Sequence, residues 1–530
     1  MGKLFKNLKP YWKSVLVIVV LLVVQALCDL SLPQYTSDII DTGIQNSGVE
    51  HILPEKITAE EFQNAQLFMT ADEQKTWQDA YSGDGDLLDR NDCSKKDLEQ
   101  FDSDLIVPIL LNYQMSMMSE DSFRELLAQQ QQGNPQAAEQ LKTMSIADIG
   151  KSMGVTLTPF ERTEEDDDNK TTVTCVDVRP LFAAMQEAGQ FTEETRSEMR
   201  SQLETMLDTM GESLVQSMGI AYAVQCDQAA GLDTDKIQTN YLWAAGGKMI
   251  AIAFAMMAVT ICVSYVAARV GAGVGRDLRK KVFSRVMQFS NAEMDQFSTA
   301  SLITRSTNDI QQVQMVTAIF LRMLLYAPIL GIGGILKVVN TGAGMGWVIV
   351  LAVLVILGIV GVLMSIAMPK FQKMQTLVDR VNLVSREILT GLSVIRAFGR
   401  EKTEEKRFDT ANQNLTKTNL FVNRVMTFMM PVMMLIMYSL TILIVWVAAH
   451  RIDGGSMQVG SMTAFITYAM MIVMSFLMLT MMSVMLPRAS VAAGRIDEVL
   501  QTKTSVQEPT APQHLAQPAG VLTFDHVSFR

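Results

Sequence analysis

The chain has 530 residues, of which 49 % are apolar and 19 % are charged, and this composition excludes a disordered or fibrous protein. The net charge of −11 argues against a nucleic-acid binder. The charge is unevenly divided, because residues 44–240 carry a net −23 and the remainder a net +12. An acidic, polar segment thus interrupts a basic, apolar chain.

Six apolar stretches are long enough to cross a bilayer as helices. About 20 apolar residues, each rising about 1.5 Å, span a hydrocarbon core of about 30 Å. Lipid offers no hydrogen bonds to the backbone, so each stretch is expected to be helical. Buried helices of a large soluble protein are the alternative, and six such stretches disfavour it. The stretches are 14–27, 249–268, 315–336, 338–369 (with a turn at 340–346), 425–449 and 456–487.

Lys and Arg cluster at alternate ends of these stretches. They precede the first stretch and follow the second, fourth and sixth, as at Arg276, Lys370 and Arg488. Basic ends face the cytoplasm. Both termini are therefore expected inside the cell, with residues 44–240 outside and the chain in the cytoplasmic membrane. The first stretch could instead be a signal peptide, but no small-x-small cleavage site follows it.

Residues 44–240 are predicted to form a small, mostly helical extracellular domain. Leu203, Met206, Met210 and their neighbours place one apolar face on a helix over 191–215. Residues 171–178 are typical of a strand. The acidic tract 161–168 lacks the ligand spacing of an EF-hand and is expected to be solvated and disordered.

The residues of this segment offer little to an enzyme or a metal site. Its only histidine is His51, so it has no zinc motif. Its cysteines, Cys93, Cys175 and Cys226, are odd in number. One disulfide and one free thiol are possible, in a pairing that the sequence leaves open.

Two polar stretches, 269–314 and 370–424, predict continuous helices that project into the cytoplasm. In the second, an apolar stripe that includes Val384, Ile388 and Ile395 is expected to end at Phe398 and Gly399. Residues 386–408, REILTGLSVIRAFGREKTEEKRF, resemble the second intracellular loop of ATP-binding-cassette exporters.

Other parts of the chain resemble the same family. Residues 283–313 are similar to its first intracellular loop, although Glu293, Ala300 and Ser301 depart from the usual pattern. Residues 33–43 and 486–500 resemble the ends of its first and sixth helices. Residues 521–530, VLTFDHVSFR, look like the first strand of its nucleotide-binding domain after a linker at 501–520. The sequence has no G-x-x-x-x-G-K-[ST] phosphate loop, so the chain is expected to be a fragment of a longer protein or to rely on a partner for ATP.

The resemblance implies an all-α polytopic membrane protein whose six long helices extend into the cytoplasm. It implies a dimer, with an identical or different second half, and nucleotide-binding domains that bind ATP and Mg²⁺ outside this chain. Short coupling helices would dock on those domains near 290–297 and 397–403. Phe398 would be the apolar anchor, unless it only completes its own helix's stripe. The implied contacts are Asn291, Met294, Asp295, Phe297, Ala397, Phe398, Gly399, Arg400 and Glu401.

The last two apolar stretches hold fifteen methionines between Met426 and Met485. Flexible, polarisable Met side chains suit a wall that accepts varied apolar substrates, although simple gap-filling is the alternative. The candidate substrate path comprises Met429, Met433, Met437, Met474 and Met478. Paired intramembrane acids, expected of a proton-driven carrier, are missing from the sequence.

The sequence therefore predicts the transmembrane subunit of an ATP-driven exporter of amphipathic drugs, lipids or peptides, in contact with lipid and without nucleic acid. The alternative is a membrane-anchored sensor whose outer domain binds a ligand. The expected parts are helix 1 (1–43), the insertion (44–240), helices 2–6 (241–500), the linker (501–520) and the strand (521–530).

Overall fold

A computed structural model describes residues 8–83, 85–130, 144–166, 169–340, 344–505, 520–521 and 523–528. The chain divides into two compact units. The first comprises Met1–Ala26, Met257–Ile329 and Ser475–Arg530, and the second comprises Leu27–Met256 and Leu330–Met474.

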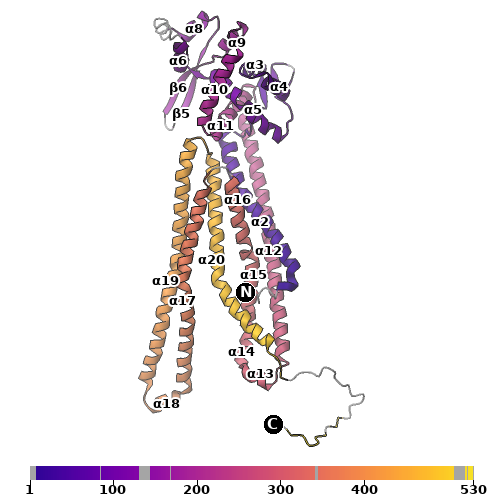
Figure 1. Cartoon of the computed structure of the whole chain (residues 1–530), viewed down its shortest axis with the longest axis vertical. Coiled ribbons are helices and arrows are strands. Elements are labelled where there is room, and N and C mark those ends of the chain that lie inside the picture. The colour runs from indigo at the N-terminus through magenta and orange to yellow at the C-terminus, as the bar shows by residue number, and fades with distance from the viewer. Residues whose placement is uncertain are drawn as a thin grey trace. The chain divides into compact units, whose positions relative to one another are not determined.

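Six helices of the described chain are long and apolar enough to cross a membrane, which confirms the six stretches (Figure 1). The third contains a short π-helical segment, η4 (Phe320–Leu324), and the first ends in another, η2 (Ile39–Gln45). The helices are α2 (Trp12–Asp38), α12 (Thr234–Val286), α15 with α16 (Ile310–Ile319 and Tyr326–Asn340), α17 (Gly346–Thr390), α19 (Glu401–Asp453) and α20 (Val459–Gln501).

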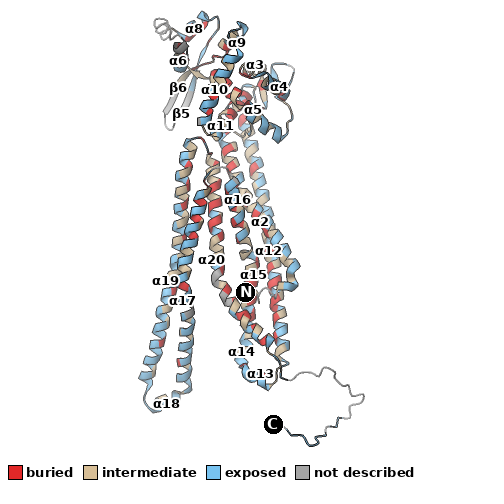
Figure 2. Ribbon diagram, in the orientation of Figure 1, coloured by how far each residue is buried: buried red, intermediate tan, exposed pale blue. Residues whose placement is uncertain are grey.

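In the first unit, apolar side chains of α2, α12, α15 and α20 share one buried cluster. Ile18, Val282, Ile310 and Val499 are fully buried in it, and Figure 2 shows buried residues along these helices. Short helices α13 (Asn291–Gln296) and α14 (Thr299–Thr304) follow α12. The expectation of one continuous helix over 269–314 is therefore wrong, because the chain turns between Val286 and Asn291 to bury Phe289 and Phe297 against each other.

In the second unit, α17 and α19 lie side by side and are joined by the short helix α18 (Leu392–Ala397), as Figure 1 shows. The helix expected to continue to Phe398 ends at Thr390 instead. Gly391 interrupts it, and its N–H bonds to the Glu387 carbonyl. Glycine lowers helix propensity by about 1 kcal/mol, which explains the break.

The insertion belongs to the second unit and combines helices with two small antiparallel sheets. One sheet has the order β1 (Lys56–Thr58), β3 (Leu87–Arg90), β2 (Tyr81–Ser82), and the other has the order β4 (Met118–Ser119), β6 (Asn169–Val176), β5 (Pro159–Asp166). Its helices are α3 (Ala59–Gln66), α4 (Ala71–Ala80), α5 (Lys95–Ser116), α6 (Glu120–Gln130), α8 (Ile146–Ser152), α9 (Arg179–Glu187), α10 (Glu193–Thr209) and α11 (Glu212–Ala229).

Three expectations for the insertion need correction or comment. The strand predicted over 171–178 is confirmed as β6, but the acidic tract is not disordered, since residues 161–166 lie in β5 and pair with β6. Residues 167–168 lie outside the described residues. The helix predicted over 191–215 is two helices, α10 and α11, which meet at Met210 and Gly211. All five cysteines of the chain are free thiols.

The expected end of the chain is only partly described. Residues 506–519 of the linker, 522 and 529–530 lie outside the described residues. The described residues of 521–530 form no strand. A strand needs a neighbour to satisfy its backbone hydrogen bonds, and no described strand lies beside this segment.

Candidate functional site

The first predicted tip is a compact turn built on α13. Ser290 precedes the helix, and its N–H donates to Glu293 Oε2 at 2.7 Å, as part of a capping box. The other oxygen of Glu293 accepts the backbone N–H of Ser505 at 3.0 Å. These hydrogen bonds, with that from the Ser290 backbone the strongest, lower the pKa of Glu293 to about 2. Glu293 therefore ties this tip to the chain that follows α20.

An ion pair fixes the same arm further along. The Arg305 guanidinium bonds to Glu498 Oε2 at 2.7 Å and to the Arg495 carbonyl at 3.0 Å, both on α20. It also lies 4.9 Å from the centre of the Phe297 ring. The arm thus moves as one body with the end of α20.

The predicted contacts at this tip separate into two groups. Asn291, Met294 and Asp295 are exposed on α13 and available to a partner. Phe297 is 3 % exposed and stacks on Phe289 at 5.9 Å between ring centroids. Its prediction as a docking contact is wrong, because its side chain already forms part of the core of the first unit.

The second predicted tip is the turn that contains α18. Gly399 has φ +60°, a conformation that glycine adopts without the strain that a side chain would introduce. The Arg400 N–H then bonds to the Ile395 carbonyl at 3.0 Å, and α19 starts at Glu401. The short helix precedes the predicted range 397–403, of which Phe398–Arg400 form the turn.

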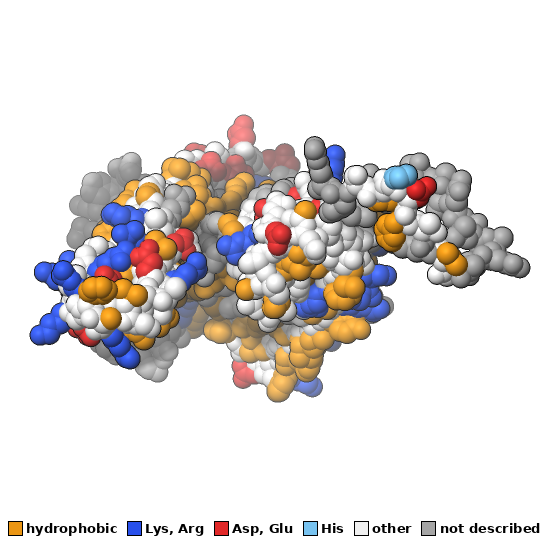
Figure 3. Space-filling model, turned by 90° about the horizontal axis from the view of Figure 1, so that it is seen from below, with side chains coloured by type: hydrophobic (Ala, Val, Ile, Leu, Met, Phe, Trp, Pro, Cys, Tyr) orange, Lys and Arg blue, Asp and Glu red, His pale blue; other side chains and the backbone are white. Residues whose placement is uncertain are grey.

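Apolar side chains are exposed at this second tip. Phe398 is 75 % exposed, and Leu389 and Val394 are also exposed. Ala397, Gly399, Arg400 and Glu401 are exposed beside it. Figure 3 looks onto this end of the hairpin and shows basic and acidic side chains around hydrophobic ones, while Figure 2 shows mostly exposed residues along the adjoining helices. An exposed apolar group within a charged rim is typical of a protein-binding surface.

Side-chain pairs brace the hairpin behind this tip. Arg407 of α19 pairs with Glu387 of α17 and, at 3.3 Å, with Glu404. Further along, Lys370 lies 5.5 Å from the centre of the Phe421 ring. The hairpin can therefore transmit a force from its tip along two helices.

The predicted methionines do not form one surface in the described structure. Met433 is 5 % exposed and packs within the second unit, whereas Met474 is 45 % exposed. Met429, Met437 and Met478 are half-buried. None of the five lines either of the two cavities found in the described structure.

Helix ends of the second unit meet next to the insertion. Asp41, in η2, accepts the Gly460 N–H at 2.7 Å and the Ser37 hydroxyl at 3.0 Å. Gly460 lies in the first turn of α20, where unpaired backbone N–H groups favour a carboxylate. Asp41 thus joins helix 1 to the start of α20, a contact that sequence spacing could not reveal.

The loop between α19 and α20, residues 454–458, packs on the first turns of α11. The Leu214 N–H donates to the Gly455 carbonyl at 3.1 Å, and the Gln458 amide donates to the Ser217 hydroxyl at 3.3 Å. A Cβ at Gly211 would lie 2.0 Å from the Gly455 carbonyl carbon. The glycine that ends the predicted helix at 211 is therefore needed for this close approach.

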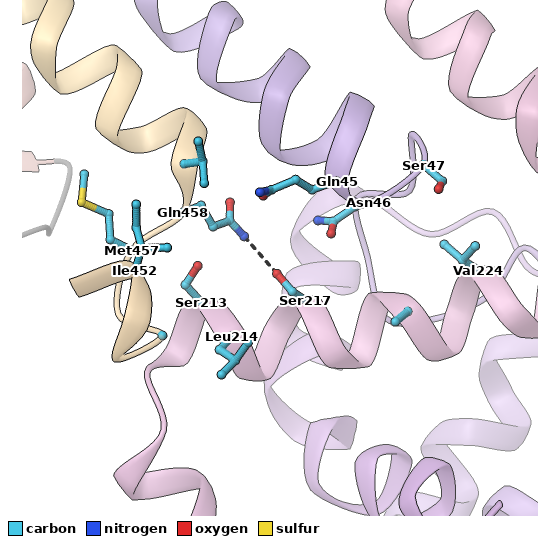
Figure 4. Close-up of a pocket in the computed structure, with 13 residues that line it drawn as sticks. Gln45, Asn46, Ser47, Ser213, Leu214, Ser217, Val224, Ile452, Met457 and Gln458 are labelled. Atoms are coloured by element: carbon cyan, nitrogen blue, oxygen red, sulfur yellow. Dashed lines mark hydrogen bonds between the residues drawn. The ribbon is translucent and has the colours of Figure 1, made fainter. Parts of the chain in front are cut away.

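A cavity of about 540 Å³ lies at this junction. Its walls come from residues 45–47 after helix 1, from α11, and from residues 452–459 around the loop (Figure 4). We name it the junction cavity. Sequence analysis missed it because its residues come from three distant segments.

Comparison with known proteins places the membrane helices in a family. Residues 234–476 match the ABC transporter transmembrane region. An uncharacterised ABC transporter ATP-binding protein of Mycobacterium bovis is 37 % identical over 268 residues, 51 % of this chain and 46 % of that protein. A similarly named Bacillus subtilis protein is 32 % identical over 297 residues, 56 % and 51 % of the two chains.

A more distant relative is an ATP-dependent lipid A-core flippase of Pseudomonas fluorescens, 26 % identical over 205 residues, which are 38 % of this chain and 33 % of that protein. The match to the first two relatives covers about half of their length. The resemblance drawn from the two intracellular loops is thereby confirmed at the level of the family.

Proposed function

Residues 234–476 belong to the ABC transporter transmembrane family, and on this premise we propose that the chain is the transmembrane subunit of an ATP-driven exporter. The basic ends of its helices favour cytoplasmic termini and an extracellular insertion. The proposed partners are nucleotide-binding domains and a second, identical or different, transporter half. The relatives' names, which specify ATP-binding proteins, support the first of these partners.

The observation that carries the proposal is the exposed apolar tip on the braced α17–α18–α19 hairpin. A nucleotide-binding domain docked on Phe398 would push or pull two membrane helices together, because Arg407 and the close packing of α17 on α19 couple them. The sequence has no phosphate loop, so the residues present do not fit ATP or Mg²⁺. This chain would supply the lever and the substrate path only.

An amphipathic cargo fits the chemistry of the membrane helices. Met429, Met437, Met474 and Met478 keep exposed surface from which flexible thioethers can contact apolar substrates. Met433 is excluded from this role, since it is buried in helix packing. The name of the Pseudomonas relative adds lipid to the candidate cargoes. A ligand-binding sensor, the alternative function, gains no support from the family match.

Replacing Phe398 by Asp tests the lever. We expect vanadate-sensitive ATPase activity to persist in membranes that contain the full transporter, while ATP-dependent movement of two fluorescent probes falls at least tenfold, because a charge at the anchor weakens docking. The probes are Hoechst 33342 and nitrobenzoxadiazole-labelled phosphatidylethanolamine, assayed in inside-out vesicles.

Leu420→Asp is the matched control, because Leu420 is an exposed apolar residue of α19 about 20 positions from the tip. It should retain transport. Normal coupled transport by Phe398→Asp would refute the coupling role, and failure of the wild-type protein to move either probe would refute the proposed amphipathic cargo.

A further inference from the structure

The junction cavity differs in charge from its surroundings. None of its thirteen lining residues is Asp, Glu, Lys, Arg or His, although the insertion carries a net −23. The other described cavity, of about 390 Å³, is lined by charged groups that include Glu50, Arg90 and Lys95. A charged ligand in the junction cavity would lose water without gaining a counter-charge, which is unfavourable.

The lining is nevertheless rich in neutral hydrogen-bonding groups. Gln45, Asn46 and Ser47 come from the end of helix 1, and Ser213, Ser217 and Gln458 come from α11 and the loop, as Figure 4 shows. Amides and hydroxyls both donate and accept hydrogen bonds. Such a set matches a ligand that carries several hydroxyl or amide groups.

Most of these groups have bonding capacity to spare. Gln458 and Ser217 bond to each other at 3.3 Å. The structure gives the side chains of Gln45, Asn46 and Ser213 no hydrogen-bond partner among the described residues, although Asn46 is only 9 % exposed. A ligand could satisfy these groups without first breaking protein contacts.

Apolar side chains complete the cavity. Leu214 and Val224 of α11 lie in one wall, and Ile452, Met457 and Val459 lie in another. The volume of about 540 Å³ is ordinary for a small-molecule site. The cavity can therefore hold a polar head together with several methylene groups.

We propose that the junction cavity binds an uncharged amphipathic molecule through a hydroxyl- or amide-rich head group. The ligand would bridge the insertion, the end of helix 1 and the α19–α20 loop, because all three contribute to the walls. This inference does not depend on transport, and it assigns the insertion a role in ligand binding.

Photolabelling of the whole chain in lipid nanodiscs tests the proposal. The probe is an alkyl β-glucoside with a diazirine in its tail, and the comparison probe is the matching alkyl glucuronide, which carries one negative charge. We expect the glucoside to label peptides from 213–224 and 452–459 more strongly than the glucuronide, with the label mapped by mass spectrometry. Equal labelling by both probes, or glucoside label confined to lipid-facing helices, would overturn the proposal.

Two matched variants locate the site. Gln45→Leu should reduce glucoside labelling of these peptides about three- to tenfold, as expected for one lost hydrogen bond. Gln216→Leu makes the same change at an exposed residue of α11 that does not line the cavity, and labelling should persist. Ser213→Ala, a small change on the opposite wall, should also weaken labelling. Equal effects of the Gln45 and Gln216 variants would refute the site.

Discussion

At the scale of single residues, one buried arginine organises the insertion. Arg179 is 7 % exposed and bonds to Glu61 at 2.7 Å, to Asp177 at 2.8 Å and to the Asn112 amide oxygen at 3.2 Å. Tyr222 of α11 donates to the same Glu61. The network joins α3, α5, α9 and α11, so its charges hold together elements that are distant in the sequence.

Arg179→Met should destabilise the insertion by about 3 kcal/mol, because it leaves Glu61 partly buried without its cation. Hydrogen–deuterium exchange of the whole chain would show loss of protection in α3 and α9. Arg162→Met, at an exposed arginine of β5, should leave protection unchanged. Unaltered protection in Arg179→Met would contradict the proposed organising role.

Asp227 makes the stability of the insertion depend on pH. Its side chain is fully buried, one oxygen accepts the Lys56 N–H at 2.9 Å, and the other has no partner among the described residues. Burial raises the pKa of Asp227 from 3.8 to about 6. The folded state then binds the proton more tightly, so stability falls as pH rises from about 4 to about 6 and is level above that.

Asp227→Asn should remove this dependence. The variant is expected to be more stable than the wild type by about 2–3 kcal/mol at pH 7.5, with the difference shrinking toward pH 4. Differential scanning calorimetry at pH 5 and pH 7.5 measures it, and Asp79→Asn, at an exposed carboxylate, is the control. A wild-type protein whose insertion gains stability between pH 5 and 7.5 through Asp227 would contradict this account.

At the scale of elements, glycines set how closely the insertion approaches the α19–α20 loop. Gly455 has φ +68°, and a Cβ there would lie 2.7 Å from the Leu214 Cβ. The neighbouring Gly454 has φ −77°, and a Cβ there meets nothing closer than 3.4 Å. These two residues therefore give a matched pair of substitutions.

Gly455→Val should part the loop from α11, whereas Gly454→Val should not. In a cysteine-free background with Ser217→Cys and Gln458→Cys, a short bismaleimide should cross-link the two sites. We expect the yield to fall severalfold only in Gly455→Val. Equal yields in both variants would show that close backbone approach does not hold this junction together.

Sequence patterns predicted the long elements well because apolar runs of bilayer length have few alternative structures. The interruptions were harder to predict. Gly391 and Gly211 each end a helix that apolar periodicity would continue. Phe297 was misassigned because its burial depends on Phe289 and Arg305, partners that only the folded turn supplies.

The acidic segment misled for a similar reason. Its charge favoured disorder, but residues 161–166 pair with β6, so backbone hydrogen bonds outweigh the repulsion along the strand. The junction cavity could not be foreseen, since its walls join residues 45–47, 213–224 and 452–459. Composition predicts which segments are polar, but not which of them meet.

At the scale of the whole molecule, the account requires opposite ends of the second unit to lie on opposite sides of the membrane. Within that unit, α18 lies at one end of α17 and α19, and the insertion lies at the other (Figure 1). The positive charges near Lys370 and Arg380 favour the cytoplasm for the first of these ends.

Sidedness is measured most directly by cysteine labelling in intact cells. With the five native cysteines replaced by alanine, a membrane-impermeant maleimide is applied to Arg400→Cys at the α18 tip and to Gln216→Cys on the insertion, both exposed positions. The account predicts that Gln216→Cys is labelled at once and that Arg400→Cys is labelled only after the cells are permeabilised. Labelling of Arg400→Cys in intact cells would contradict the coupling tip, the topology and the proposed transport mechanism together.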